Sequence, residues 1–418
     1  MKTMNVSIVI LCLSLVLFGC TSRPQNKELN DYTDTIINIY TSYVNEQQFY
    51  QNYGELILEH FPGLEINLMM PSDTSDWEAR FEKIKNNQPD LMLFYTDEYE
   101  KLSEQSYLLD LDPYVKKDKF DLDKYADSMI DAVSTDTGSL YGLVPRVNIS
   151  GIYYNKDLFD QLKINYPTSG MDWHELLNIV LRFEDNAIGL ESTFSDPNNL
   201  LMEIANTNNW SFIDSQNDSI SFQKQDWTSA IQQIIDLYHT QTVSGVEDDL
   251  FLQGKAALHT GNLLYIDQLL GINNFSWDFI PSPVNSKKRD ESHSIYFDRI
   301  ISIPKESTNK DLSWEIIKML MDENVADEYK SFPPNVSTLK SRMNQYEGIN
   351  LEEFWQQNLD TKPGILRSDL SSSFLEEFYG ILEDQLQLAI DEKQTADQTL
   401  DEIIKQTEIA YEKEKLRR

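Results

Sequence analysis

Residues 35–69 read TIINIYTSYVNEQQFYQNYGELILEHFPGLEINLM, and this stretch decides the fold. Apolar runs at 35–40 and 64–69 have the length and composition of buried strands. Between them, apolar residues recur at helical spacing over 47–60, and a Phe-Pro-Gly turn at 61–63 ends that helix. The stretch therefore predicts a strand, a helix and a second strand.

The next residues continue the same alternation. A helical pattern at 77–84 is followed by Pro89 and by a third apolar run at 90–95. Strands that alternate with helices imply an α/β fold with a parallel, doubly wound sheet. In such sheets ligands bind beyond the carboxyl ends of the strands. These ends predict a first set of candidate ligand contacts: Tyr40, Thr41, Ser42, Tyr95 and Asp97.

The remainder of the chain contains further elements without an internal repeat. A turn-rich connection is expected at 108–114, strands at 149–154, 256–259 and 300–304, and helices from 155, at 173–183, 227–238, from 251 and at 374–390. A last helix is expected after Thr395, because Thr395 and Gln398 have the spacing of a capping box.

Composition limits the kind of partner. The chain has 418 residues, which suits one large or two medium domains, and 40% of them are hydrophobic, enough for packed cores. The formal net charge is −34 and no basic stripe is present, so binding to nucleic acid is not expected. The small basic cluster at 287–289 is flanked by acidic residues and reads as a solvated turn.

Motifs of catalysis and metal binding are missing from the sequence. There is no G-x-S-x-G elbow, no phosphate-binding loop and no zinc signature among the five histidines, so we expect neither a metal nor a cofactor. The 69 acidic residues leave open a pair of catalytic carboxylates of the glycosidase kind.

The amino terminus resembles a bacterial lipobox. Lys2 precedes an apolar run at 6–18, and Gly19 precedes Cys20. This pattern predicts a signal peptide at 1–19, removed on export, a lipid (palmitate-type) anchor on Cys20 and a polar tether at 20–32. The anchored protein would lie on the outer face of the cell membrane. An ordinary secretory signal peptide and an uncleaved anchor are the alternatives.

An ordered set of landmarks spans nearly the whole mature chain. It includes QPDLMLF at 88–94, YGLVP at 141–145, IYYNKDLF at 152–159, FLQGKAAL at 251–258 and IPKESTNK at 303–310. With these residues the chain resembles the family 1 extracellular solute-binding proteins, especially the maltose-binding type, which are the receptor lipoproteins of ABC importers.

The resemblance implies an α/β, two-lobed, periplasmic-binding-protein-like fold of type II, with a hinge between the lobes. It places the first lobe at 33–144 plus 300–340 and the second at 145–299 plus 341–418. It also implies a monomeric receptor that binds a sugar or oligosaccharide between the lobes and delivers it to the membrane permease of an ABC transporter. The rivals are an exported lipoprotein glycosidase and a binding protein for a non-sugar solute such as a peptide.

The resemblance also implies particular ligand contacts. Asp97 occupies the place of a sugar-binding aspartate, with Phe94 and Tyr95 beside it; a helix cap is the alternative for Asp97. Asn148 falls at a polar crossover position, and Arg146 nearby would meet an acidic ligand or form a surface ion pair. The remaining contacts are Gly261, Asn262 and Tyr265, in a loop where Leu263 departs from the family's Trp, and Tyr379, for which core packing is the alternative.

Overall fold

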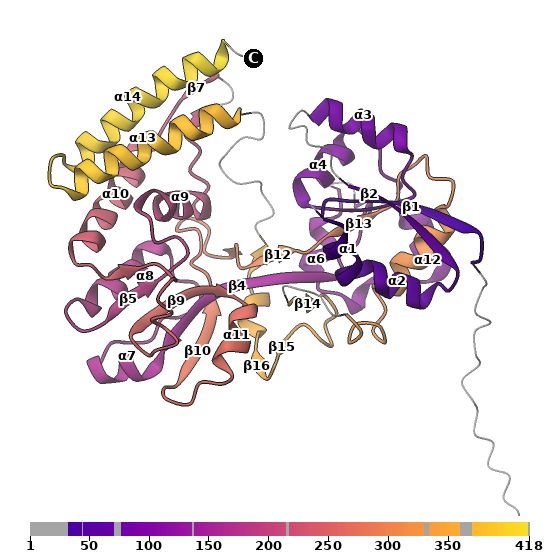
Figure 1. Ribbon diagram of the computed structural model, residues 1–418, viewed down its shortest axis with the longest axis horizontal. Helices are drawn as coiled ribbons and strands as arrows, with labels where there is room; N and C mark the ends of the chain where they lie inside the picture. The colour runs from indigo at the N-terminus through magenta and orange to yellow at the C-terminus, as the bar shows by residue number, and fades with distance from the viewer. Residues whose placement is uncertain are drawn as a thin grey trace, which may run out of the picture.

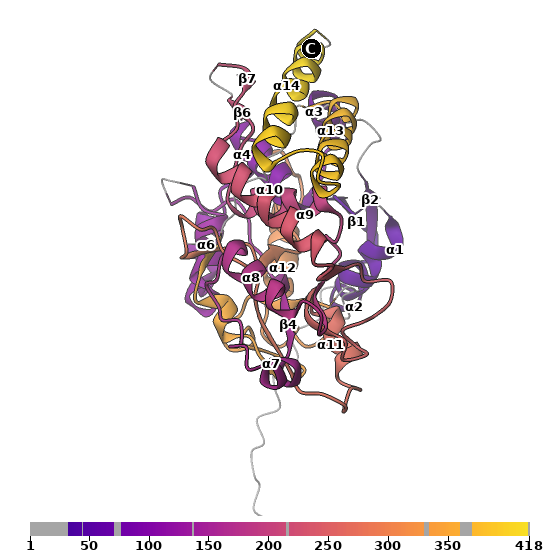
Figure 2. The same cartoon turned by 90° about the vertical axis from the view of Figure 1, so that its left-hand side faces the viewer.

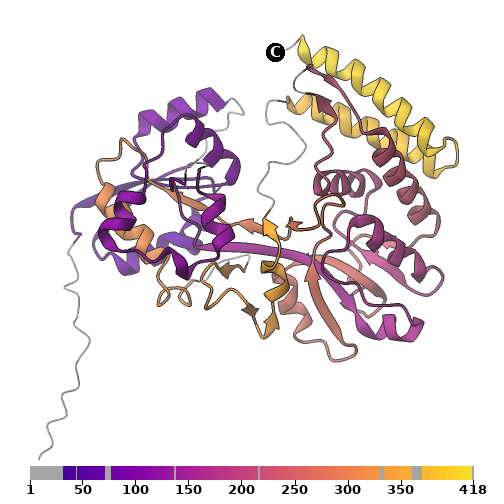
Figure 3. The same ribbon diagram turned by 180° about the vertical axis from the view of Figure 1, so that it is seen from behind.

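The computed structural model describes residues 32–43, 45–70, 77–135, 138–214, 217–329, 334–359 and 370–416. The predicted signal peptide, Cys20 and all of the tether except Tyr32 lie outside the described residues. Two α/β lobes lie side by side, and a long strand, β4, runs from one to the other (Figure 1). The view from behind shows the same division (Figure 3), and in the view from the side the second lobe lies in front of the first (Figure 2).

The sheet of the first lobe confirms the predicted strand–helix–strand pattern. Its parallel strands are β1 (Thr35–Thr41), β2 (Leu64–Met69) and β3 (Leu91–Phe94), in the order β3-β1-β2. The edge strand β13 (Ile300–Ser302) comes from far along the chain and pairs antiparallel with β3, with Ile300 opposite Phe94.

Eight helices named here belong to this half of the chain or pack against it. They are α1 (Glu46–Phe49), α2 (Glu55–His60), α3 (Trp77–Asn87), α4 (Thr96–Glu104), α5 (Asp112–Asp118), η2 (Leu122–Lys124), α6 (Asp127–Ala132) and α12 (Lys310–Leu320). The helix predicted at 47–60 is interrupted by a π-turn, η1 (Tyr50–Gly54). The connection predicted as turn-rich at 108–114 contains the start of α5, because Pro113 is tolerated in a first helical turn.

The second lobe is built on a sheet in the order β10-β4-β9-β5-β8. The strands are β4 (Arg146–Asn155), β5 (Ile188–Glu191), β8 (Val243–Ser244), β9 (Ala256–Asn262) and β10 (Trp277–Pro281). The predicted helix from 251 is wrong: residues 251–254 form turns, and Gly254, at φ +72°, ends them before a helix can propagate.

The helices of the second lobe cover this sheet, with the last two at one end of the lobe (Figure 1). They are α7 (Lys156–Leu162), α8 (Trp173–Val180), η3 (Leu181–Phe183), α9 (Pro197–Thr207), α10 (Lys224–His239), α11 (Leu264–Leu269), α13 (Ser372–Ile390) and α14 (Ala396–Lys415). The capping box of Thr395 and Gln398 is confirmed at the start of α14. Short elements complete the chain: β6 (Ile213–Asp214), β7 (Ser219–Ile220), β11 (Glu291–Ser292), β15 (Gln345–Tyr346), β16 (Ile349–Asn350), η4 (Glu352–Trp355) and β17 (Asn358–Leu359).

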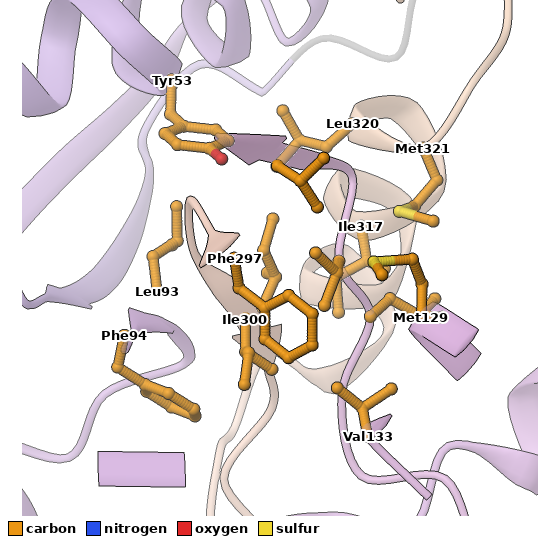
Figure 4. Close-up of a cluster of buried hydrophobic side chains, with 14 of the residues drawn as sticks. Tyr53, Leu93, Phe94, Met129, Val133, Phe297, Ile300, Ile317, Leu320 and Met321 are labelled. Atoms are coloured by element: carbon orange, nitrogen blue, oxygen red, sulfur yellow. The ribbon is translucent and has the colours of Figure 1, made fainter. Parts of the chain in front are cut away.

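Three strands form the crossover between the lobes. The first half of β4 pairs antiparallel with β12 (Ile295–Phe297) and β14 (Val336–Ser337), while its second half belongs to the second sheet. Phe297 and Ile300 lie among core residues of the first lobe such as Leu93 and Ile317, so the crossover is anchored there (Figure 4). The exact lobe boundaries stay a prediction.

No helix in the described part of the chain is long and apolar enough to cross a membrane. Within the same residues, no group of three or more His, Cys, Asp or Glu side chains is arranged to hold a metal ion.

Candidate functional site

Strand β4 presents two different faces where it crosses between the lobes. Val147 and Ile149 are buried, at 0% and 1% exposure, and pack into the core. Asn148 and Ser150 alternate with them and so point to the opposite face. On the neighbouring strand β12, Tyr296 pairs with Asn148, which brings its ring to the same face as the two polar side chains.

Tyr296 presents a half-exposed ring on this face. The residue is 49% exposed, and desolvation raises the pKa of its phenol to about 12, with the Glu203 carboxylate adding to the rise. An exposed aromatic ring beside polar side chains suits contact with a ligand.

Helix α9 contributes an acidic side chain to the same place. Desolvation raises the pKa of Glu203, and His293 acts in the opposite direction. Figure 1 shows α9 in the second lobe, between α10 and the crossover. We call Asn148, Ser150, Glu203, His293 and Tyr296 the crossover cluster.

Asn148 carries an unused acceptor in this cluster. Its Oδ1 atom is buried and has no hydrogen-bond partner among the described residues. A buried polar atom without a partner costs about 1–3 kcal/mol, so native proteins rarely leave one unpaired. A ligand hydroxyl or amine would satisfy Asn148, and this supports its predicted role.

The carboxyl ends of β1 and β3 carry a separate buried polar group. The Tyr40 hydroxyl donates to Glu98 Oε1 at 2.9 Å, Ser42 donates to Oε2, and Arg80 Nη1 lies 3.2 Å from Oε1. Glu98 is 3% exposed, whereas the predicted contact Asp97 is exposed in the first turn of α4. Asp97 caps no helix, since the N-cap residue is Tyr95.

A hollow of about 50 Å³ opens beside this buried group. It is lined by residues that include Tyr40, Met69, Met70 and Arg80. That volume is small compared with the several hundred Å³ of typical ligand pockets. Tyr40 and Ser42 therefore act here mainly as partners of Glu98, and Thr41 is fully buried. Their roles as ligand contacts stay predictions.

The crossover is tied to the first lobe by Asp298. Tyr53 donates a 2.6 Å hydrogen bond to Oδ2 of Asp298, and the Tyr43 hydroxyl lies 3.2 Å from Oδ1. The adjacent guanidinium of Arg299 lies between two rings, with its carbon 3.7 Å from the Tyr43 centroid and 3.8 Å from the Tyr95 centroid. Tyr95 is 47% exposed, so it keeps one accessible surface.

Arg146 has a structural role in the hinge. It is 8% exposed, its Nη2 donates to the Asn335 carbonyl at 2.7 Å, and its Nη1 donates to the Ala326 carbonyl at 3.2 Å. The guanidinium also lies 4.4 Å from the centroid of the Tyr329 ring. Neither a surface ion pair nor an accessible acidic-ligand contact describes this arginine.

The other predicted contacts are distributed over the two lobes. Phe94 is fully buried in the first core. Gly261 pairs with Gly151 in the second sheet, and exposed Asn262 accepts a hydrogen bond from the Leu264 amide. Tyr265 stacks on His259 with centroids 3.8 Å apart, and Tyr379 is half-buried beside Phe378. Their contact with a ligand stays a prediction.

Four members of the crossover cluster did not figure in the sequence prediction: Ser150, Glu203, His293 and Tyr296. The alternation of polar and apolar residues over 147–150 was a usable signal for β4, but nothing local distinguishes Glu203 from other helical acids. Tyr296 lies beside Asn148 because β12 pairs with β4, a pairing between segments distant in the sequence.

Comparison with solved structures identifies proteins that share this two-lobed architecture. Solved structures with the same two-lobed fold include a family 1 extracellular solute-binding protein from Alicyclobacillus acidocaldarius, with a TM-score of 0.65 at 12% identity over 91% of this chain and 99% of that one. The sugar-binding protein MalE from Xanthomonas citri gives 0.62 at 14% identity over 91% and 98%. Lmo0181 from Listeria monocytogenes, in complex with cycloalternan, gives 0.55 at 17% identity over 89% and 98%.

The sequence model described as bacterial extracellular solute-binding protein matches residues 58–341, which is more than half of the chain. This family consists of binding proteins, which confirms the expectation that the chain is not an enzyme. The predicted two-lobed α/β fold is confirmed by the same comparisons. The chain belongs to the bacterial extracellular solute-binding proteins.

Proposed function

We propose that the protein is a lipid-anchored receptor that binds a sugar or oligosaccharide between its lobes and delivers it to an ABC transporter permease. The crossover cluster is the observation that carries this proposal. Tyr296 supplies a half-exposed aromatic ring, and Asn148 supplies a buried, unpaired acceptor on the same face. A flat ring with acceptors beside it suits the apolar face and the hydroxyl edge of a pyranose.

Proteins of the same fold support the carbohydrate as ligand class. Their solved structures are described with cycloalternan, with mannobiose and with D-mannitol. All three ligands are neutral and rich in hydroxyl groups. The cluster offers acceptors for such hydroxyls on Asn148 and Glu203.

Binding to a carbohydrate panel tests this proposal. We expect one or more neutral mono- or oligosaccharides to raise the Tm of the whole chain, and solution scattering to show compaction as the lobes close. Tyr296→Ala should weaken binding about tenfold or more, whereas Tyr296→Phe, which keeps the ring, should bind nearly as well. Leu270→Ala is the control, because Leu270 is exposed and lies outside the cluster.

Two outcomes would contradict this proposal. If peptides or other non-sugar solutes bind while no carbohydrate does, the ligand class is wrong. If sugars bind but Tyr296→Ala has no effect, the site lies elsewhere.

The anchor and the permease are part of the proposal on other grounds. The anchor rests on the sequence around Cys20, and the permease rests on membership of the family. A tethered receptor keeps captured ligand near the membrane, where a permease would receive it. Uptake of the bound sugar by cells that carry or lack this protein tests delivery.

A further inference from the structure

Tyr95 places an exposed aromatic ring at one edge of the first sheet. It directly follows Phe94, the last residue of the parallel strand β3, and so lies at the carboxyl end of that strand, where sheets of this kind bind ligands. The Tyr95 residue is 47% exposed, whereas Phe94 is fully buried. One aromatic side chain of the first lobe is thus accessible at the edge where a ligand is expected.

Arg299 fixes the orientation of this ring. Its guanidinium carbon lies 3.8 Å from the Tyr95 centroid, and its Nη2 donates to the Tyr95 hydroxyl at 2.8 Å. The Tyr43 ring covers the other side of the guanidinium, at 3.7 Å. A planar cation that is stacked between two rings and bonded to one of them restricts the rotation of Tyr95.

Arg299 is in turn held by the residue before it. Its Nη1 donates to the Asp298 carbonyl, and the Asp298 carboxylate accepts a hydrogen bond from Tyr53. Both residues belong to the connection that leads from β12 into β13. Tyr296 lies on β12 three residues before Arg299, and three residues of extended chain span at most about 11 Å. One short segment therefore carries Tyr296 of the crossover cluster and orients Tyr95.

The Tyr95 hydroxyl has a proton to offer a ligand. Its oxygen accepts the hydrogen bond from Arg299, and a phenol also has one proton to donate. Within the ranges that the structure describes, no group accepts that proton. A hydroxyl that already accepts from a guanidinium becomes a stronger donor, because successive hydrogen bonds polarise one another.

We infer that Arg299 is a positioning residue for ligand binding, which holds Tyr95 so that its ring face and its hydroxyl proton meet a sugar unit of the ligand. This inference rests on the proposed function. Arg299 is 2% exposed and so does not contact the ligand itself. The Tyr95 donor complements the unpaired Asn148 acceptor, since each sugar hydroxyl both donates and accepts.

Calorimetric titration of the whole chain with D-mannitol, mannobiose, cycloalternan and glucose oligomers tests the role of Tyr95. For the probes that bind, Tyr95→Ala should weaken binding about tenfold, because it removes both the ring and the donor. Tyr95→Phe keeps the ring and loses the donor, and it should weaken binding by about threefold.

A double-mutant cycle tests whether Arg299 acts through Tyr95. Arg299→Lys keeps the charge and loses the planar stacking, and it should weaken binding about fivefold in the parent chain. In the Tyr95→Ala background the same substitution should change affinity by less than about twofold, because no ring remains to be positioned. A purely structural role of Arg299 would give the same loss in both backgrounds.

Ser313→Ala is the matched control for lost stability. Ser313 is fully buried on α12 and donates to the Asp90 carbonyl at 2.8 Å, at the end of β3 opposite to Tyr95. Its substitution should lower the Tm without changing the affinity for any probe. Thermal unfolding of every variant verifies that it is folded at the temperature of the titration.

The failures of the inference and of the proposed function are distinguishable. Unchanged binding in Tyr95→Ala, equal losses for Arg299→Lys in the two backgrounds, or a comparable loss in Ser313→Ala overturns the inference and leaves the sugar receptor intact. Binding of no probe by the parent chain overturns the proposed function, and the inference falls with it.

Discussion

The Arg299 guanidinium covers one face of the Tyr95 ring, 3.8 Å from its centroid, and its Nη2 donates to the Tyr95 hydroxyl at 2.8 Å. Tyr95 follows the last residue of β3, and Arg299 precedes the first residue of β13, where the ends of the two strands pair. Tyr43 covers the other side of the guanidinium, at 3.7 Å. The exposed ring of Tyr95 is thus held by a segment that leads from the crossover into the first lobe.

Arg299→Lys should destabilise the protein by about 1–2 kcal/mol. Lysine keeps the charge but loses the planar stacking between two rings and the bond to the Tyr95 hydroxyl. Urea unfolding measures the loss. Arg182→Lys is the control, since Arg182 is exposed on η3, and it should change stability by less than about 0.5 kcal/mol. Equal effects of the two substitutions would contradict this assignment of Arg299.

The two tyrosines that bind Asp298 should differ in importance. Tyr53→Phe removes a 2.6 Å hydrogen bond in a residue that is 1% exposed, and should cost about 1.5–3 kcal/mol. Tyr43→Phe removes contacts of 3.2 and 3.3 Å to the two oxygens and should cost less. Chemical unfolding of both variants tests this order. A larger loss of stability in Tyr43→Phe would contradict this ranking of the two hydrogen bonds.

The buried pair of Glu191 and His259 should matter strongly for the second lobe. Glu191 Oε2 lies 2.7 Å from Nδ1 of His259, and the two residues are 0% and 5% exposed. His259→Ala leaves the carboxylate without this partner and should cost about 3–5 kcal/mol. His259→Asn, which keeps a donor near the Nδ1 position, should recover part of that loss. If the denaturation midpoint of His259→Asn is no higher than that of His259→Ala, the loss of stability comes from the missing ring and not from the missing donor.

The raised pKa of Glu203 predicts that the stability of the fold depends on pH. Because burial raises its pKa, the folded protein binds this proton more tightly than the unfolded chain does. The carboxyl therefore stabilises the fold below the unfolded value of about 4.5, and this contribution is lost as pH rises through the folded pKa.

Glu203→Gln should accordingly raise the Tm at pH 7, and the gain should shrink as the pH falls toward 4. Thermal unfolding between these pH values measures the difference. Glu408→Gln provides the baseline at each pH, because Glu408 is exposed. A gain independent of pH would refute the role of desolvation at Glu203.

Cys20→Ser should release the protein from the membrane fraction without loss of ligand binding. The substitution removes the thiol that the predicted lipid requires, while the described lobes begin at Tyr32. Fractionation of cells and a binding measurement on the released protein check both halves. Continued membrane attachment would disprove the predicted anchor.

The predicted strands and most of the predicted helices were recognisable because their signals are local. The apolar runs at 64–69 and 90–95 gave β2 and β3, and Thr395 with Gln398 marked the start of α14. The antiparallel edge strand β13 was recognised as a strand, but its pairing with β3 was not predicted. That pairing joins segments distant in sequence, and no local pattern encodes it.

The candidate site was predicted less well than the fold. Asn148 was expected at the crossover, and its unpaired Oδ1 supports that position. The carboxyl end of β1 led instead to Glu98, which Tyr40, Ser42 and Arg80 surround. The sequence analysis placed Arg146 near a ligand, but in the structure its guanidinium donates to the carbonyls of Ala326 and Asn335.

By itself the sequence determined the position of the most strongly patterned strands and helices, because hydrophobic periodicity reports burial along a single element. Tertiary structure alone decided that Tyr296 of β12 lies beside Asn148 of β4, and that Arg299 lies between Tyr43 and Tyr95. These relationships depend on how separate elements pack, and the free energy of that packing is shared among residues far apart in the chain.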